Sequence, residues 1–172
     1  MNLTGTGVAL VTPFNQDKNI DFTSLGRIID HCIEGGVNYL VCLGTTGETV
    51  TLTLKEKQEL LDFTKNQTAG RVPLVAGFGG NDTMRISEQI NSFNLDGYSA
   101  ILSSSPNYNK PSQEGIFQHY KHIALNSPLP IILYNVPSRT GQNMEAETTI
   151  RLANEFEQII GIKEAANDIL QS

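Results

Sequence analysis

The sequence predicts an α/β fold in which helices cover a parallel β-sheet. Short apolar or β-branched runs recur roughly every 30 residues, about the length of one strand-helix unit, and helix-period segments separate them. Nearly continuous apolar strands that alternate with helices are typical of parallel sheets buried on both faces. The periodicity is compatible with a doubly wound open sheet and with a closed barrel.

Six strands and five helices are expected along the chain. The strands fall at residues 7–13, 39–44, 72–78, 98–103, 130–135 and 159–165. Apolar residues at helical spacing indicate the first helix, which ends at the glycine pair 35–36; they are Leu25, Ile28, Ile29, Cys32 and Ile33. The other helices fall at residues 54–66, 82–95, 112–126 and 145–155. No G-x-G-x-x-G turn of a dinucleotide-binding sheet follows the first strand.

Composition and charge narrow the class of protein. A formal net charge of −6 argues against a nucleic-acid partner or an anionic membrane surface. The N-terminus lacks the pattern of a signal peptide, and no run approaches the ~20 apolar residues of a membrane span, so we expect a cytoplasmic protein. Cys32 and Cys42 are expected to be buried free thiols, and they indicate neither a metal site nor a disulfide framework.

Lys163 is the most informative residue because it lies within the apolar strand 159–165. An ordinary lysine amine is almost fully protonated at neutral pH, and burial disfavours the charged form. A buried strand lysine is therefore a candidate for attacking a carbonyl carbon and forming a Schiff base. The alternative is a lysine at a strand end that extends to water or pairs with Glu164.

Further polar residues follow other strands, where parallel α/β folds hold their active sites. Residues 44–48 (Gly-Thr-Thr-Gly-Glu) form a loop whose N–H groups and hydroxyls suit a carboxylate, although a threonine-capped helix start has the same pattern. Two prolines stiffen the loop 104–111 that carries Tyr108, which is also typical of a rigid turn. Tyr134 lies near the end of the fifth strand and Arg139 lies in the loop after it, so both are candidate site residues. The alternative to a functional role is a hydrogen-bonded core tyrosine and a solvated arginine.

Taken together, these strand-end residues predict one reaction class. Lys163 would attack a keto group and a tyrosine would shuttle protons during carbinolamine breakdown. The threonine loop would bind one carboxylate and Arg139 a second.

The chain resembles the dihydrodipicolinate synthase family, the class I aldolase group that includes N-acetylneuraminate lyase. The resemblance rests on residues 8–13 (Val-Ala-Leu-Val-Thr-Pro), the loop 44–48, and residues 161–165 (Gly-Ile-Lys-Glu-Ala), and it spans essentially all 172 residues. The neuraminate lyase branch has Ser-Thr in place of Thr45 and Thr46 and lacks the Ser-Arg-Thr-Gly of residues 138–141. Arg139 therefore favours the synthase branch.

The resemblance implies a (β/α)8 TIM barrel, here truncated after strand six. Residues 1–172 would form an incomplete catalytic domain without the C-terminal strands and helical region. Pyruvate would form a Schiff base with Lys163 and add to L-aspartate 4-semialdehyde, in diaminopimelate and lysine biosynthesis. No metal or organic cofactor is implied, because the lysine acts as the electron sink.

The resemblance also assigns roles within the site. Tyr134 would be the proton shuttle, and Thr45 would link it to Tyr108, which the family supplies from a neighbouring subunit. The N–H groups of Thr45 and Thr46 would bind the pyruvate carboxylate, and Arg139 the semialdehyde carboxylate. A homotetramer, built as a dimer of dimers, is expected.

Departures from the family's lysine-binding site predict an enzyme that lysine does not inhibit. In lysine-inhibited members, a tyrosine stands at Asn107, histidines at Leu54 and Lys57, and an acidic residue at Arg85, so only Asn81 matches. An arginine facing the effector's ammonium group places like charges together. The measurement is an activity assay of the assembled enzyme with millimolar lysine, in which inhibition would contradict this prediction.

Two other functions stay open. A truncated paralogue or fragment could retain the motifs as a non-catalytic binding or assembly module. A pyruvate-dependent sugar-acid aldolase or lyase is the alternative within the same family, and Arg139 argues against it.

Overall fold

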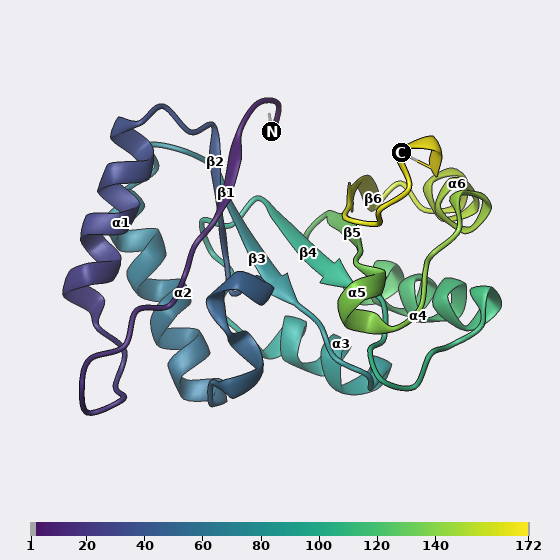
Figure 1. Ribbon diagram of the computed structural model, residues 1–172, viewed down its shortest axis with the longest axis horizontal. Coiled ribbons are helices and arrows are strands. Elements are labelled where there is room, and N and C mark those ends of the chain that lie inside the picture. Colours follow the sequence, from purple (N-terminus) through teal and green to yellow (C-terminus); the bar gives the residue numbers. More distant parts are fainter. Residues whose placement is uncertain (1–2, 172) are drawn as a thin grey trace. The chain divides into compact units, whose positions relative to one another are not determined.

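The computed structural model describes residues 3–171, which divide into two compact units (Figure 1). The first unit comprises residues 3–77 and 94–99, and the second comprises residues 78–93 and 100–171. Strands and helices alternate along the chain in both units, as the periodicity predicts.

The first unit contains three parallel strands and two long helices. The strands are β1 (Gly7–Ala9), β2 (Tyr39–Cys42) and β3 (Leu74–Phe78), the last residue of which belongs to the second unit. The helices are α1 (Phe22–Glu34) and α2 (Leu54–Thr68), with two short 3-10 helices, η1 (Thr45–Gly47) and η2 (Thr49–Thr51), between β2 and α2. β2 pairs with both β1 and β3.

Side-chain caps fix where these two helices begin. The Asp21 carboxylate accepts from the Ser24 N–H at 3.0 Å, and Thr53 and Glu56 form a reciprocal capping box. α1 and α2 lie side by side (Figure 1), and the rings of Phe22 and Phe63 join them with centroids 5.0 Å apart.

The second unit contains three parallel strands and the remaining helices. The strands are β4 (Ala100–Ser104), β5 (Ile131–Asn135) and β6 (Ile159–Glu164). The helices are α3 (Thr83–Ser92), α4 (Gln113–Asn126), α5 (Pro137–Thr140), α6 (Ala146–Glu155) and the 3-10 helix η3 (Ile169–Gln171). β5 pairs with β4 on one side and with β6 on the other, with one irregularity of register near its start.

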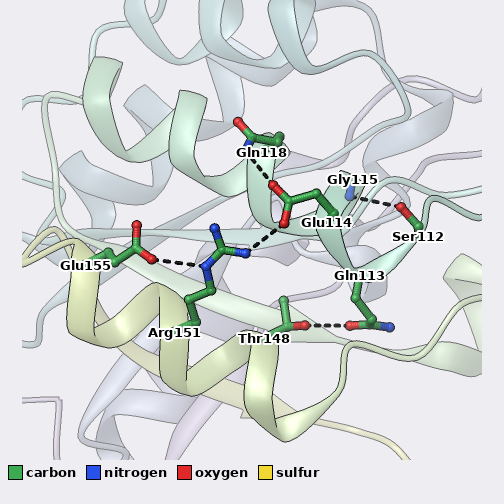
Figure 2. Close-up of polar contacts among 8 residues, drawn as sticks. All are labelled: Ser112, Gln113, Glu114, Gly115, Gln118, Thr148, Arg151 and Glu155. Atoms are coloured by element: carbon green, nitrogen blue, oxygen red, sulfur yellow. Dashed lines mark hydrogen bonds and ion pairs between the residues drawn. The ribbon is translucent and has the colours of Figure 1, made fainter.

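A polar cluster fastens α6 to α4, as Figure 2 shows. Arg151 donates to Glu114 at 2.7 Å and to Glu155 at 3.0 Å. The guanidinium carbon also lies 3.4 Å from the centroid of the Phe117 ring. The Gln113 side chain accepts from the Thr148 hydroxyl at 2.8 Å, in the first turn of α6. These contacts hold the segment between β5 and β6 against α4.

His119 is buried beneath the end of β4. Its side chain is 3% exposed, and Nδ1 shares a hydrogen bond of 2.8 Å with the Thr83 hydroxyl on α3. The pKa of His119 is lowered to about 4, mainly because the side chain is buried; the backbone of Ser104 partly opposes this shift, and nearby His122 adds a smaller contribution in the same direction as burial. His119 is therefore neutral in the folded protein at pH 7.

We predict that protonation of His119 makes stability fall as the pH drops from about 6.5 to about 4. As the pH falls, the histidine is protonated in the unfolded chain before it is protonated in the folded protein. The free energy of unfolding therefore decreases by about 3 kcal/mol across that window. Urea unfolding between pH 7 and pH 4 measures the loss. His119→Gln is expected to flatten the pH dependence, and a slope in this variant equal to that of the wild type would contradict the prediction.

All six expected strands and all five expected long helices are present. The first strand ends at Ala9 instead of residue 13, because the Thr12 hydroxyl donates to the Gly47 carbonyl and Pro13 has no N–H for a sheet. The fourth strand begins at Ala100 instead of residue 98, because the Tyr98 N–H closes a turn onto the Leu95 carbonyl.

Further boundaries differ from the expected ones. The helix expected at 82–95 ends at Ser92, since the backbone of Asn94 pairs instead with the Gln58 side chain. The one-turn helix α5 was not expected, and Pro137 at its first position favours it.

One expectation about the cysteines is wrong. Cys42 is buried, and that burial raises the pKa of its thiol. Cys32 is only half-buried, because it lies at the margin of the apolar stripe of α1. In the part of the chain that the structure describes, no helix is long and apolar enough to span a membrane.

Candidate active site

The pairing of β5 with β6 brings two of the predicted site residues together. Tyr134 lies opposite Lys163 in the parallel register. Because residues opposite each other in neighbouring strands point to the same face, the two side chains meet, and the lysine Nζ lies 4.5 Å from the centroid of the tyrosine ring. The Tyr134 side chain is buried, with 7% exposed. This pair is the core of the candidate site.

The predicted burial of Lys163 is wrong for this chain. Lys163 is exposed, and so are Ile160 and Ile162 on the same strand, with 44% and 39% of their surface accessible. The physical reason is that β6 pairs with β5 and with no other strand among residues 3–171. The side chain of Lys163 is therefore in contact with water in the described chain.

Glu164 does not serve as the counter-ion of Lys163. Its carboxylate accepts from the Asn135 amide at 3.0 Å, from the Ala166 N–H at 2.7 Å and from the Gln171 amide at 3.0 Å. Partial burial raises the pKa of Glu164, but these hydrogen bonds outweigh it, and the net pKa lies below the usual range. Within residues 3–171 no ion pair forms between Lys163 and Glu164. The alternative that Lys163 is a structural lysine paired with Glu164 is therefore wrong.

The Thr45–Thr46 loop belongs to the first unit and forms η1. Both threonines are exposed, and the backbone bonds of the loop come from the N–H groups of Gly47 and Glu48. Neither the Thr45 nor the Thr46 N–H donates to another group among the described residues, so both are available to an acceptor. The loop thus has the features of a carboxylate-binding turn.

A strained residue precedes this loop. Leu43 has φ of +58° although it is 3% exposed, and a bulky side chain rarely adopts that conformation. Its carbonyl approaches Gly77 so closely that a Cβ there would lie 2.3 Å from the oxygen. Glycine at position 77 therefore permits the turn that leads into Thr45.

Tyr108 and Arg139 both lie in the second unit, in the loops that follow β4 and β5. Tyr108 is 86% exposed and has φ of +65°. Arg139 is exposed on α5, where its N–H donates to the Val136 carbonyl at 2.9 Å. Among the described residues, neither side chain forms a hydrogen bond, an ion pair or a ring contact with Lys163 or Tyr134. The predicted links from Thr45 to Tyr134 and Tyr108 stay predictions.

A pocket is lined by residues that follow β5 and β6 in the chain. Its volume is about 430 Å³, and it is lined by Pro137, Ser138, Asn143 and residues 165–168. In the described chain, no group of three or more His, Cys, Asp or Glu side chains lies close enough to hold a metal ion.

The sequence analysis missed Asn135. This residue is fully buried at the end of β5, and its amide contacts Glu164, Asn143 and Met144. A polar residue within a buried apolar strand was the available signal, since such a group requires hydrogen-bond partners.

Comparison with known proteins identifies the family of this chain. The family model for the Dihydrodipicolinate synthetase family matches residues 2–172. A 4-hydroxy-tetrahydrodipicolinate synthase from Parabacteroides distasonis is 52% identical over 171 residues, which are 99% of this chain and 58% of the relative. One from Flavobacterium psychrophilum is 54% identical over 168 residues, covering 98% of this chain and 57% of the relative. The chain thus spans less than two thirds of these relatives.

Solved structures agree in fold. The chloride-inhibited dihydrodipicolinate synthase from Acinetobacter baumannii, in complex with pyruvate, has a TM-score of 0.94 and 41% identity, over 99% of this chain and 58% of the other. Dihydrodipicolinate synthase from Aquifex aeolicus has a TM-score of 0.91 and 36% identity, over 97% of this chain and 57% of the other.

These matches confirm the predicted fold class, an α/β fold of the (β/α)8 TIM-barrel type, of which this chain carries strands one to six. They also confirm the resemblance inferred from the strand-end motifs. The chain therefore belongs to the Dihydrodipicolinate synthetase family.

Proposed function

We propose that this chain is the part of a 4-hydroxy-tetrahydrodipicolinate synthase that carries the Schiff-base lysine. The enzyme would be a lyase that condenses pyruvate with L-aspartate 4-semialdehyde in lysine and diaminopimelate biosynthesis. The observation that carries this proposal is the pairing of Tyr134 with Lys163, whose Nζ lies 4.5 Å from the tyrosine ring. The names of the relatives, and the pyruvate in the Acinetobacter structure, support the substrate class.

The chemistry would begin at the lysine amine. Neutral Nζ of Lys163 attacks the keto carbon of pyruvate, and proton transfer gives a carbinolamine. The Tyr134 hydroxyl donates a proton to the departing hydroxide, so that water leaves and a protonated Schiff base forms. Loss of a methyl proton then gives an enamine, whose carbon attacks the aldehyde of the second substrate. Cyclisation with release of the lysine completes the reaction.

Other residues would bind the substrates. The free N–H groups of Thr45 and Thr46 suit the pyruvate carboxylate, and the exposed guanidinium of Arg139 suits the carboxylate of the semialdehyde. Thr45 would relay protons between Tyr134 and Tyr108. No metal or organic cofactor takes part in this scheme, because the iminium nitrogen accepts the electrons.

The assembly we propose is a cytoplasmic homotetramer made of two dimers. Tyr108 is 86% exposed on a loop whose backbone has positive φ at both Tyr108 and Lys110. A tyrosine held outward in this way could enter the site of a neighbouring subunit. If two subunits donate Tyr108 to each other's sites, the dimer is the smallest assembly with a complete site.

The test of the proposal is exchange of the pyruvate methyl protons in D₂O, followed by proton NMR. Enamine formation labilises these protons, so the chain is expected to accelerate their replacement by deuterium, and Lys163→Ala is expected to remove the acceleration. Exchange no faster than in buffer would count against the proposal. Incubation with N-acetylneuraminate distinguishes the proposed synthase from a sugar-acid lyase, because only the lyase would release pyruvate from N-acetylneuraminate.

A non-catalytic module is the second candidate function. The exposure of Lys163 favours it, since Schiff-base lysines are typically held in apolar pockets. A stably folded chain, judged by circular dichroism, that neither exchanges pyruvate protons nor forms an adduct would fit this candidate.

A further inference from the structure

A second residue pair stands next to Tyr134 and Lys163 in the same strands. Asn135 lies opposite Glu164 in the parallel register, one position beyond the tyrosine and the lysine. Successive side chains of a strand point to opposite faces, so this pair occupies the other face of the β5–β6 ribbon. The amide of Asn135 donates to both carboxylate oxygens of Glu164, each at 3.0 Å.

Asn135 connects three segments of the second unit. Its side chain is fully buried; the oxygen accepts from the Met144 N–H at 3.0 Å and the nitrogen donates to the Asn143 side chain at 2.8 Å. Its backbone carbonyl accepts from the Ala165 N–H at 2.9 Å. The loop between β5 and α6 is thereby fastened to the end of β6.

The same network continues to α4. The amide nitrogen of Gln113 donates to the Asn143 carbonyl at 2.8 Å, and its oxygen accepts from Thr148 in α6 (Figure 2). The Asn135–Glu164 pair is therefore held by a packed framework and does not depend on the strand pairing alone.

This support matters because β6 has a strand partner on one side only within residues 3–171. A one-residue slip of β6 against β5 would turn Lys163 to the face opposite Tyr134. A buried amide bonded to both oxygens of one carboxylate resists such a slip, because slipping would leave the amide without its partner.

We propose that Asn135 and Glu164 are positioning residues that hold Lys163 over Tyr134 for Schiff-base formation. The inference rests on the proposed function for its chemical consequence, whereas the geometric consequence can be measured without any activity. The two residues act through the strand register and do not touch the substrate.

The test is a double-mutant cycle with two readouts. Asn135→Asp places two carboxylates side by side, and Glu164→Gln removes one acceptor oxygen; the double variant exchanges donor and acceptor and keeps the net charge. The first readout is the NMR chemical shift of the Lys163 ε-methylene protons, which the ring current of Tyr134 is expected to move upfield. The signal is assigned by its disappearance from the spectrum of Lys163→Arg. The second is the rate of the borohydride-trapped pyruvate adduct at Lys163.

Each single variant is expected to reduce the upfield shift and to slow adduct formation by on the order of 10-fold or more. The double variant is expected to recover most of both. Glu157→Gln, which makes the same charge change at an exposed position before β6, is expected to change neither. If Asn135→Asp does not fold by circular dichroism, Glu164→Gln carries the comparison, because its side chain is only half-buried.

The outcomes separate the positioning role from the proposed function. Folded single variants that keep the wild-type ring-current shift would overturn the positioning role, whether or not an adduct forms. A wild-type chain that forms no adduct would count against the proposed function, while loss of the ring-current shift in the single variants, with recovery in the double variant, would still support positioning.

Discussion

Lys163→Arg is expected to abolish the covalent pyruvate adduct completely. Arginine keeps the positive charge and the length of the side chain, but its guanidinium remains protonated at any usable pH and cannot attack a carbonyl. The measurement is the intact mass of the chain after incubation with pyruvate and borohydride. Both the ring contact with Tyr134 and the strand pairing can survive this substitution, so the loss would report chemistry and not unfolding.

Lys55→Arg is the matched control. Lys55 is exposed on α2 and forms a surface ion pair with Glu59. It is expected to leave the adduct unchanged. An adduct that persists in Lys163→Arg and maps to another lysine would show that the strand lysine is not the reacting group.

Tyr134→Phe is expected to slow adduct formation by about 100-fold, the lower end of the range for loss of a general acid. The phenyl ring still supports the lysine Nζ, so only proton transfer to the departing hydroxide is lost. The time course of borohydride trapping measures the effect.

Tyr98→Phe provides the matched control for this substitution. Tyr98 is buried in the first unit, where its hydroxyl donates to the Leu61 carbonyl at 3.0 Å. Its loss is expected to affect stability and not the trapping rate of the folded protein. A Tyr134→Phe rate within about 3-fold of the wild type would remove the tyrosine from the proton-transfer step.

Much of the fold follows from local pattern. Two expected helices start at residues 82 and 112, and in the structure Asp82 and Ser112 cap them, each side chain accepting from an N–H three residues later. Boundaries moved where a local turn or a partner distant in sequence ended the element, and the pairing of Asn94 with Gln58 is an example of the second kind. Tyr98, for example, has strand-like neighbours in sequence, but Gly97 at φ of +87° turns the chain before β4.

The candidate site was predictable only in part. The strand ends that carry Tyr134 and Lys163 were predicted, but the register that places the two residues opposite each other was not, because it includes a shift between Ile131 and Ile132. The exposure of Lys163 does not follow from its apolar neighbours, because burial of a strand depends on what covers it. The sequence signals that Asn135 needs hydrogen-bond partners, but it does not identify them, since they lie eight or more residues away and meet only through the fold.

The most direct measurement is peptide mapping of the chain after reaction with pyruvate and borohydride. The proposed function predicts a single reduced pyruvate adduct on the peptide that contains Lys163, in proportion to the fraction of folded protein. A folded chain that gains no mass, or that gains it at a lysine other than Lys163, would contradict the assignment of Lys163 as the Schiff-base residue.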